Sequence, residues 1–63
     1  MNYIKAERIR AGLSQNELAR RSGVKQSVIS DIESGKTKLP RVDTVKQIAH
    51  VLGFEWVNYF REG

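Results

Sequence analysis

The sequence predicts a single all-α domain of five short helices. The chain has only 63 residues, apolar residues recur at helical spacing along most of it, and no segment alternates apolar and polar residues as a strand does. A domain of this size buries only about 60% of its unfolded surface, so it depends on close packing. The chain contains no cysteine, so its core must be built from aliphatic and aromatic side chains. We expect residues 1–63 to fold as one domain.

The first helix is expected over about residues 2–11. Ile4, Arg8 and Ala11 fall on one face of this segment, with Ile9 beside them. A glycine follows directly and should end the helix.

The second helix begins with a strong local signal. In the segment SQNE, Ser14 stands at the N-cap and Glu17 at the third helical position, which is the arrangement of a capping box. Leu18 and Ala19 should point inward, and Gly23 should end the helix.

The third helix is expected over about residues 26–34, after a tight turn. Gly23 allows this turn, with a positive φ, and Val24 should be buried in it. Ala19 is small enough for the second helix to pass close to its neighbour. The apolar stripe of the third helix consists of Val28, Ile29 and Ile32. A small residue, a turn glycine and apolar anchors at these offsets indicate a helix-turn-helix, and Gly35 should end its second helix.

Two more helices are expected after the basic loop KTKLPR at 36–41. The fourth should span about residues 42–52. Its apolar positions at helical spacing are Val42, Val45, Ile48, Ala49 and Leu52. The fifth should span about residues 55–60 and is dense in apolar side chains.

Positive charge is concentrated in one third of the chain. The net charge is +4, and residues 20–41 carry all of this excess, with six basic and two acidic side chains. The remaining residues contain five of each sign. A local basic excess on a small domain favours a polyanionic partner, although a solubilising surface has the same composition.

The third helix should present a polar face to solvent once its apolar stripe is buried. The residues on this face are Lys25, Gln26, Ser27, Ser30 and Asp31. Such directional hydrogen-bonding groups are the kind that read base edges in the major groove of DNA. A cation at the start of a helix, as at Lys25, opposes the helix dipole by about 0.3–1 kcal/mol. A nearby phosphate or guanine would explain this lysine; a tolerated surface residue is the alternative.

Residues 4–41, IKAERIRAGLSQNELARRSGVKQSVISDIESGKTKLPR, resemble the helix-turn-helix domain of the Cro/cI (XRE-type) transcriptional regulators. The similarity is greatest to the lambdoid phage repressors, which place the second helix of the motif in the major groove. The specific pieces are GLSQNELA, the Gly23-Val24 turn, the spacing around Ile32–Pro40 and IAHVLG. The match covers nearly the whole chain and weakens after Gly53. It implies a lambda-repressor-like fold.

The resemblance also implies roles for individual residues. Those implied to contact bases are Lys25, Gln26, Ser27, Ser30 and Asp31. Those implied to contact phosphate are Gln15, Ser34, Lys36, Lys38 and Arg41. Gln15 matches a glutamine that also braces the base-reading side chains. Arg8 and Glu33 match a partly buried ion pair that ties the first helix to the third, and two independent surface charges are the alternative.

The sequence departs from the family pattern at several of these positions. Lys25 replaces a common Thr or Ser cap, and Asp31 stands where Gln is frequent. An acid that faces DNA must accept from a cytosine amino group, pair with a neighbouring cation or point aside. Arg41 and Glu55 occupy places where a Ser cap is usual. Base preference therefore cannot be copied from a relative.

Nothing in the sequence suggests catalysis. It shows no nucleophile–base pair and no cluster of metal-ligating residues, and the single histidine, His50, is expected on the exposed side of the fourth helix. We expect no enzymatic activity, no metal site and no cofactor. No apolar run approaches 18 residues, and the N-terminus lacks the apolar core of a signal peptide, so we expect a cytoplasmic protein that does not bind membranes.

The leading hypothesis is a sequence-specific transcriptional regulator, most simply a repressor that blocks promoter access on double-stranded DNA. The resemblance implies a prokaryotic or phage protein associated with the nucleoid. An antitoxin of a toxin–antitoxin pair would use the same DNA face and is the close alternative. A protein-interaction module is the alternative from a different class, and the basic segment at 20–41 argues against it.

The last helix suggests a homodimer on a palindromic operator. Five of the seven residues at 54–60 are apolar, more than one core-facing stripe can cover. A second copy of the chain would cover the remainder, unless the small core uses every aromatic side chain. The residues expected at this dimer interface are Trp56, Tyr59 and Phe60.

Overall fold

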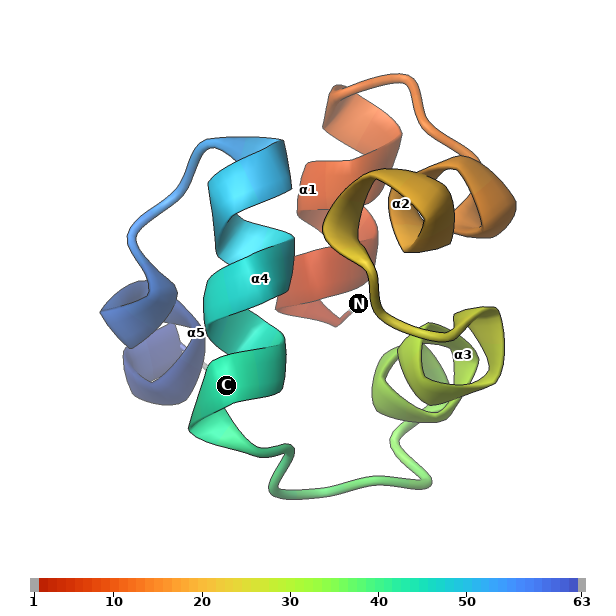
Figure 1. Cartoon of the computed structure of the whole chain (residues 1–63). Coiled ribbons are helices and arrows are strands. Elements are labelled where there is room, and N and C mark those ends of the chain that lie inside the picture. Colours follow the sequence, from red (N-terminus) through yellow and green to blue (C-terminus); the bar gives the residue numbers. More distant parts are fainter. Residues whose placement is uncertain (1, 63) are drawn as a thin grey trace.

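The computed structural model describes residues 2–62, and this part of the chain contains five α-helices and no strand (Figure 1). They are α1 (Tyr3–Arg10), α2 (Gln15–Ser22), α3 (Gln26–Ser34), α4 (Val42–Leu52) and α5 (Trp56–Glu62). The predicted all-α fold is confirmed, and α3 and α4 have the predicted bounds. Helix α1 is one residue shorter at each end than predicted. Helix α5 begins one residue later and continues to Glu62.

Helix α1 starts at a side-chain cap that also contacts another helix. Asn2 Oδ1 accepts hydrogen bonds from the backbone N–H groups of Ile4 at 2.8 Å and Lys5 at 3.2 Å. Asn2 Nδ2 donates to the carbonyl oxygen of Ile32 at 3.0 Å. Because Ile32 belongs to α3, this one side chain both begins α1 and attaches it to the helix that carries the polar face.

The predicted helix-turn-helix signals are present as local structure. Ser14 Oγ accepts from the Glu17 N–H at 3.1 Å, and Glu17 Oε1 accepts from the Ser14 N–H at 2.8 Å, which confirms the capping box. Gly23 ends α2 with a φ of 75°. A β-carbon at Gly23 would meet no atom within 4 Å, so space does not require a glycine here. The left-handed backbone conformation does.

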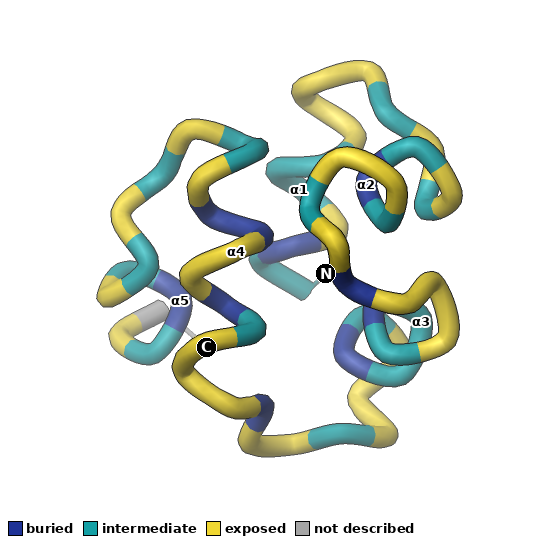
Figure 2. Tube along the Cα trace, in the orientation of Figure 1, coloured by how far each residue is buried: buried dark blue, intermediate teal, exposed yellow. Residues whose placement is uncertain are grey.

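The core lies where the five helices meet (Figure 2). Its buried residues are Ile4, Leu18, Val24, Ile29, Ile32, Val45, Ile48 and Tyr59. Helix α2 packs against α3 and α4, α1 packs against α3 and α5, and α4 packs against α5. Each helix therefore contributes to one common core, as expected for a chain this short.

Three residues expected on apolar faces lie outside this core. Ile9 is 52% exposed, because five residues of helix turn it about 140° away from Ile4. Ala11 shares the direction of Ile4 but is the exposed C-cap of α1, beyond the packed part of the helix. Val42 is 43% exposed because it is the first residue of α4, where the helix extends past its neighbours. The terminal positions Ala11 and Val42 therefore cover less of the core than their periodicity predicts.

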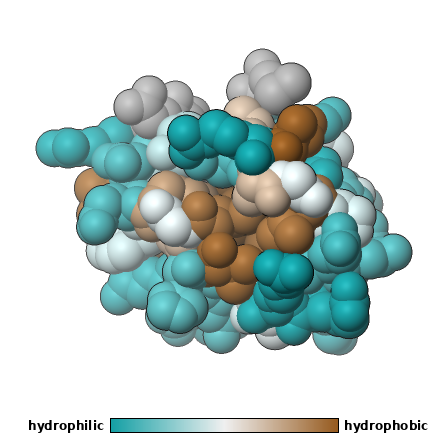
Figure 3. Space-filling view, turned by 90° about the horizontal axis from the view of Figure 1, so that it is seen from above, coloured by the Kyte–Doolittle hydropathy of each residue, from teal (hydrophilic) through white to brown (hydrophobic). Residues whose placement is uncertain are grey.

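Helix α3 lies at one edge of the molecule, and the loop at 35–41 runs from its C-terminal end to α4 (Figure 1). The view from above shows a different face, with a central group of apolar side chains surrounded by hydrophilic ones (Figure 3). None of the helices in residues 2–62 combines the length and apolar character needed to cross a bilayer.

Candidate nucleic-acid interface

The polar face of α3 is directed away from the core. Lys25, Gln26 and Ser27, at the start of the helix, are exposed. Ser30 and Asp31, one turn further along, are half-buried. The inner side of the same helix buries Ile29 and Ile32 completely, as predicted, and this packing sets which side chains face outward.

The first turn of α3 has no side-chain cap. Lys25 is the N-cap residue, and its carbonyl oxygen accepts from the N–H groups of Val28 at 3.0 Å and Ile29 at 3.1 Å. The Lys25 side chain makes no capping hydrogen bond. Lys25 therefore places a positive charge at the positive end of the helix dipole, as the sequence suggested, and its side chain accepts no hydrogen bond from the N–H groups of the first turn.

The loop after α3 holds its cations on a hydrogen-bonded turn. Ser34 Oγ donates to the Asp31 carbonyl oxygen at 3.2 Å and accepts from the Lys36 N–H at 3.3 Å. The Thr37 N–H donates to the same carbonyl oxygen at 3.0 Å. The charged residues that follow along this loop, Lys38 and Arg41, are exposed together with Lys36, whereas Pro40 is buried. Three cations thus lie along the loop that connects α3 to α4.

Arg8 and Glu33 form an ion pair between α1 and α3. Arg8 Nε donates to Glu33 Oε2 at 2.8 Å, and Arg8 Nη2 donates to Glu33 Oε1 at 2.9 Å. Arg8 Nη1 also donates to the Leu13 carbonyl oxygen at 2.9 Å. The two side chains are only 12% and 3% exposed. A two-pronged contact of this kind is geometrically specific and holds α3 at a defined orientation on α1.

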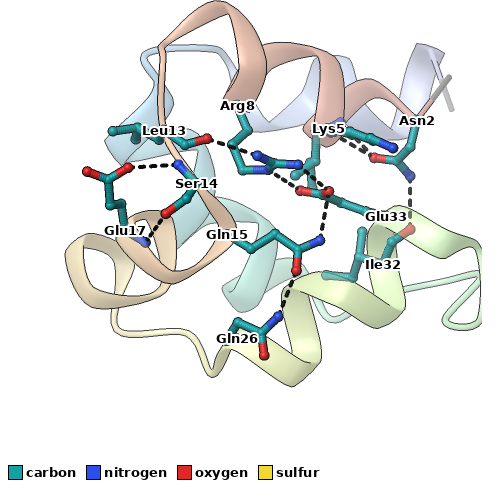
Figure 4. Close-up of polar contacts among 11 residues, drawn as sticks. Asn2, Lys5, Arg8, Leu13, Ser14, Gln15, Glu17, Gln26, Ile32 and Glu33 are labelled. Carbon is teal, nitrogen blue, oxygen red and sulfur yellow. Dashed lines mark hydrogen bonds and ion pairs between the residues drawn. The ribbon is translucent and has the colours of Figure 1, made fainter.

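Gln15 connects this ion pair to the exposed start of α3 (Figure 4). Gln15 Nε2 donates to Glu33 Oε1 at 3.1 Å, and Gln15 Oε1 accepts from Gln26 Nε2 at 2.7 Å. The first residue of α2 therefore links a buried carboxylate to the side chain expected to read a base.

Burial and hydrogen bonding act in opposite directions on the pKa of Glu33. Burial raises the pKa of its carboxyl group, but the hydrogen bonds from Arg8 and Gln15, together with the charge of Arg8, lower it by more, so the net shift is downward. The hydrogen bond to Glu33 raises the pKa of Arg8. Both groups are thus held in their charged forms.

The lowered pKa of Glu33 predicts a loss of stability in acid. Because this pKa is lower in the folded chain than in the unfolded chain, the stabilisation is complete above the ordinary glutamate pKa of about 4.3 and is lost as the pH falls through the folded value. We expect the midpoint of urea unfolding to decrease below about pH 4.3. The decrease should be smaller in Glu33→Gln, although not absent, because hydrogen bonds from Ser14 also lower the pKa of Glu17. Parallel declines in the two proteins would contradict this role of Glu33.

Three features of this region were not predicted. They are the Gln15–Glu33 hydrogen bond, the Asn2 contact with α3 and the exposure of Leu39, which reaches 80% within the basic loop. Asn2 could have been recognised as an N-cap from its place before an apolar helix. Asp31 pairs with no cation in residues 2–62, where the ion pairs are Arg8–Glu33 and Glu7–Arg10. Of the three outcomes considered for Asp31, pairing with a neighbouring cation is therefore not observed.

The aromatic residues of α5 divide between the core and the surface. Tyr59 is only 8% exposed and packs in the core, so it offers little surface to a second copy. Trp56 and Phe60 are half-buried and meet edge to face, with ring centroids 6.1 Å apart. Val57 is 40% exposed, and the Lys46 ammonium lies 5.0 Å from the centroid of the Trp56 ring. Trp56, Val57 and Phe60 are thus the apolar side chains of α5 that remain partly accessible to solvent.

Residues 2–62 contain no group of three or more His, Cys, Asp or Glu side chains placed to hold a metal ion. His50 is exposed on α4, in agreement with its predicted position. The candidate interface consists of hydrogen-bonding side chains and cations on α3 and on the loop that follows it.

A helix with an exposed polar face, packed across a shorter partner helix and followed by cations, defines a helix-turn-helix domain. A family model described as Helix-turn-helix matches residues 4–57. An uncharacterized HTH-type transcriptional regulator of Bacillus subtilis (strain 168), YqaF, is 32% identical over 60 residues, which cover 95% of this chain and 78% of that protein. The comparison with solved structures gave no significant match.

The chain belongs to the helix-turn-helix family of Cro/cI (XRE) type, a family of DNA-binding transcriptional regulators. The resemblance seen in the sequence is therefore confirmed.

Proposed function

We propose that this protein is a sequence-specific repressor that reads double-stranded DNA with α3 in the major groove. The observation that carries the proposal is the arrangement of Gln26. This side chain is exposed at the start of α3 and is held there by Gln15, while cations flank the helix at Lys25 and along the loop at 36–41. The proposed base-reading and phosphate-binding groups thus come from the start of α2, from α3 and from the loop that follows it.

The proposed contacts divide by chemistry. Gln26, Ser27, Ser30 and Asp31 are the candidates for base edges, and Lys25 at the helix start is a candidate for a base edge or a phosphate. Gln15, Ser34, Lys36, Lys38 and Arg41 are the candidates for phosphate. Such a protein would block access to a promoter and would act in the cytoplasm, where the bacterial or phage DNA is.

We further propose that two copies bind a palindromic operator. The accessible apolar side chains of α5, Trp56, Val57 and Phe60, support a contact between copies. Two-fold pairing would place the two α3 helices about 34–36 Å apart, so the half-sites should lie about one helical turn apart.

Selection of bound duplexes from a random pool tests the proposed function. A repressor of this kind should enrich one sequence arranged as an inverted repeat, whereas a protein-interaction domain should enrich none. Enrichment of a single site without an inverted repeat would support specific binding and contradict the proposed dimer.

Replacing Gln26 by alanine should relax the base preference at one position of each half-site. A glutamine amide can form two hydrogen bonds with adenine, and each good pair of this kind is worth about 1–3 kcal/mol of discrimination. The measurement is selection with the variant, compared with selection by the wild-type chain. An unchanged consensus would show that Gln26 does not read a base. Ser27→Ala is the control at the neighbouring residue, and any change of preference that it causes should fall at a different base position.

A further inference from the structure

Two hydrogen bonds connect the buried carboxylate of Glu33 to the side chain proposed to read a base. Gln15 Nε2 donates to Glu33 Oε1 at 3.1 Å, and Gln26 Nε2 donates to Gln15 Oε1 at 2.7 Å (Figure 4). Glu33 is 3% exposed and is held in place by Arg8. The connection therefore runs from a fixed group inside the domain to the exposed start of α3.

The chemistry of Glu33 determines the direction of both bonds. An ionised carboxylate only accepts hydrogen bonds, so Gln15 must turn its NH2 group towards Glu33. The carbonyl oxygen of Gln15 then lies on the side of Gln26, which must turn its own NH2 group inward to meet it. The carbonyl oxygen of Gln26 is left pointing away from Gln15 (Figure 4).

We propose that Glu33 is a positioning residue that makes Gln26 select adenine over guanine, acting through the amide of Gln15. The inference rests on the proposed reading of DNA by α3. In this orientation Gln26 offers an acceptor, Oε1, beside the second N–H of its amide, which is a donor. Adenine presents the complementary pair, a donor at N6 and an acceptor at N7. Guanine presents acceptors at both O6 and N7, so its O6 would face the Gln26 oxygen.

Replacing the carboxylate by a carboxamide removes the constraint. In Glu33→Gln the side chain at this position can donate as well as accept, so the amides of Gln15 and Gln26 can both turn over. A reversed Gln26 directs its oxygen to Gln15 and presents two N–H donors outward. Two donors match the two acceptors of guanine, so the variant should accept either purine.

The test is selection from a random pool with the wild-type chain, Glu33→Gln and the control Arg8→Lys. The position of interest is the one at which Gln26→Ala loses its preference. The wild-type chain should favour adenine over guanine there by about 5- to 140-fold, and Glu33→Gln should bring this ratio close to one. Arg8→Lys disturbs the same ion pair but keeps the carboxylate, so it should retain the preference. The ratio compares two bases at one position, so a uniform loss of folded protein does not change it.

A second variant covers the case in which Glu33→Gln does not fold. Gln15→Leu leaves the Arg8–Glu33 ion pair in place and removes the connection, together with the proposed phosphate contact of Gln15, which does not distinguish the two purines. It should therefore also bring the ratio close to one. The inference is overturned if either folded variant keeps the wild-type ratio, or if the wild-type chain prefers guanine at this position. A wild-type chain that enriches no sequence overturns the proposed function and this inference with it.

Discussion

Replacing Arg8 by alanine should lower the free energy of unfolding by about 3–5 kcal/mol, the usual cost of leaving one member of a buried ion pair without its partner. Glu33, whose side chain is 3% exposed in the intact chain, would lose its charged partner and keep Gln15 as its remaining side-chain hydrogen-bond partner. A 63-residue domain has a total stability of roughly 3–9 kcal/mol at typical values per residue. The variant should therefore lose a large part of its stability, which circular dichroism during urea titration would measure.

Two further variants separate the ion pair from general effects of charge. Arg10→Ala removes an arginine from the same helix, but its side chain is 77% exposed, so stability should change little. Combining Arg8→Met with Glu33→Leu should recover part of the stability lost in Arg8→Ala, since no buried charge is then left unpaired. If Arg8→Ala unfolds like the wild-type chain but loses DNA binding, Arg8 belongs to the DNA-contacting surface instead.

The helix-turn-helix could be predicted because its signals are local. The capping box at Ser14, the left-handed turn at Gly23 and the spacing of Ile29 and Ile32 each depend on residues close together in the chain. Local signals of this kind determine where a helix begins, where it ends and which side is apolar. They were sufficient to identify α3 and its polar face.

The contacts between helices could not be predicted in the same way. Gln15 and Glu33 are 18 residues apart, and their hydrogen bond depends on how closely α2 crosses α3. The position of Tyr59 depends on how α5 is rotated against α1 and α4, and periodicity alone does not determine that rotation. For the same reason the sequence did not show that Tyr59 packs in the core. The resemblance supplied the Arg8–Glu33 pair and the bracing role of Gln15, but not the hydrogen bond from Gln15 to Glu33.

The affinity for the selected operator should fall about 10⁴-fold between 50 and 200 mM salt. Each subunit carries four cations on the proposed DNA-binding surface, Lys25, Lys36, Lys38 and Arg41, and all four are exposed. Two subunits would then neutralise about eight phosphates, and each contributes about −0.9 to the slope of log K against log salt concentration, or about −7 in total. A single subunit would give a slope of about −4 and a loss on the order of 10². The slope, measured by fluorescence anisotropy, therefore reports both phosphate contact and the number of chains bound.

Two variants assign this slope to the loop after α3. Lys38→Ala should weaken binding to all sequences alike and flatten the slope by about one for each subunit bound. Arg10→Ala removes the same charge from α1, whose C-terminal end lies away from α3, and should leave the slope nearly unchanged (Figure 1). A loss confined to one base position would make Lys38 a base-reading residue. A slope near −4 with one chain per site in analytical ultracentrifugation would exclude the dimer, because an inverted repeat bound by two chains requires both sets of phosphate contacts.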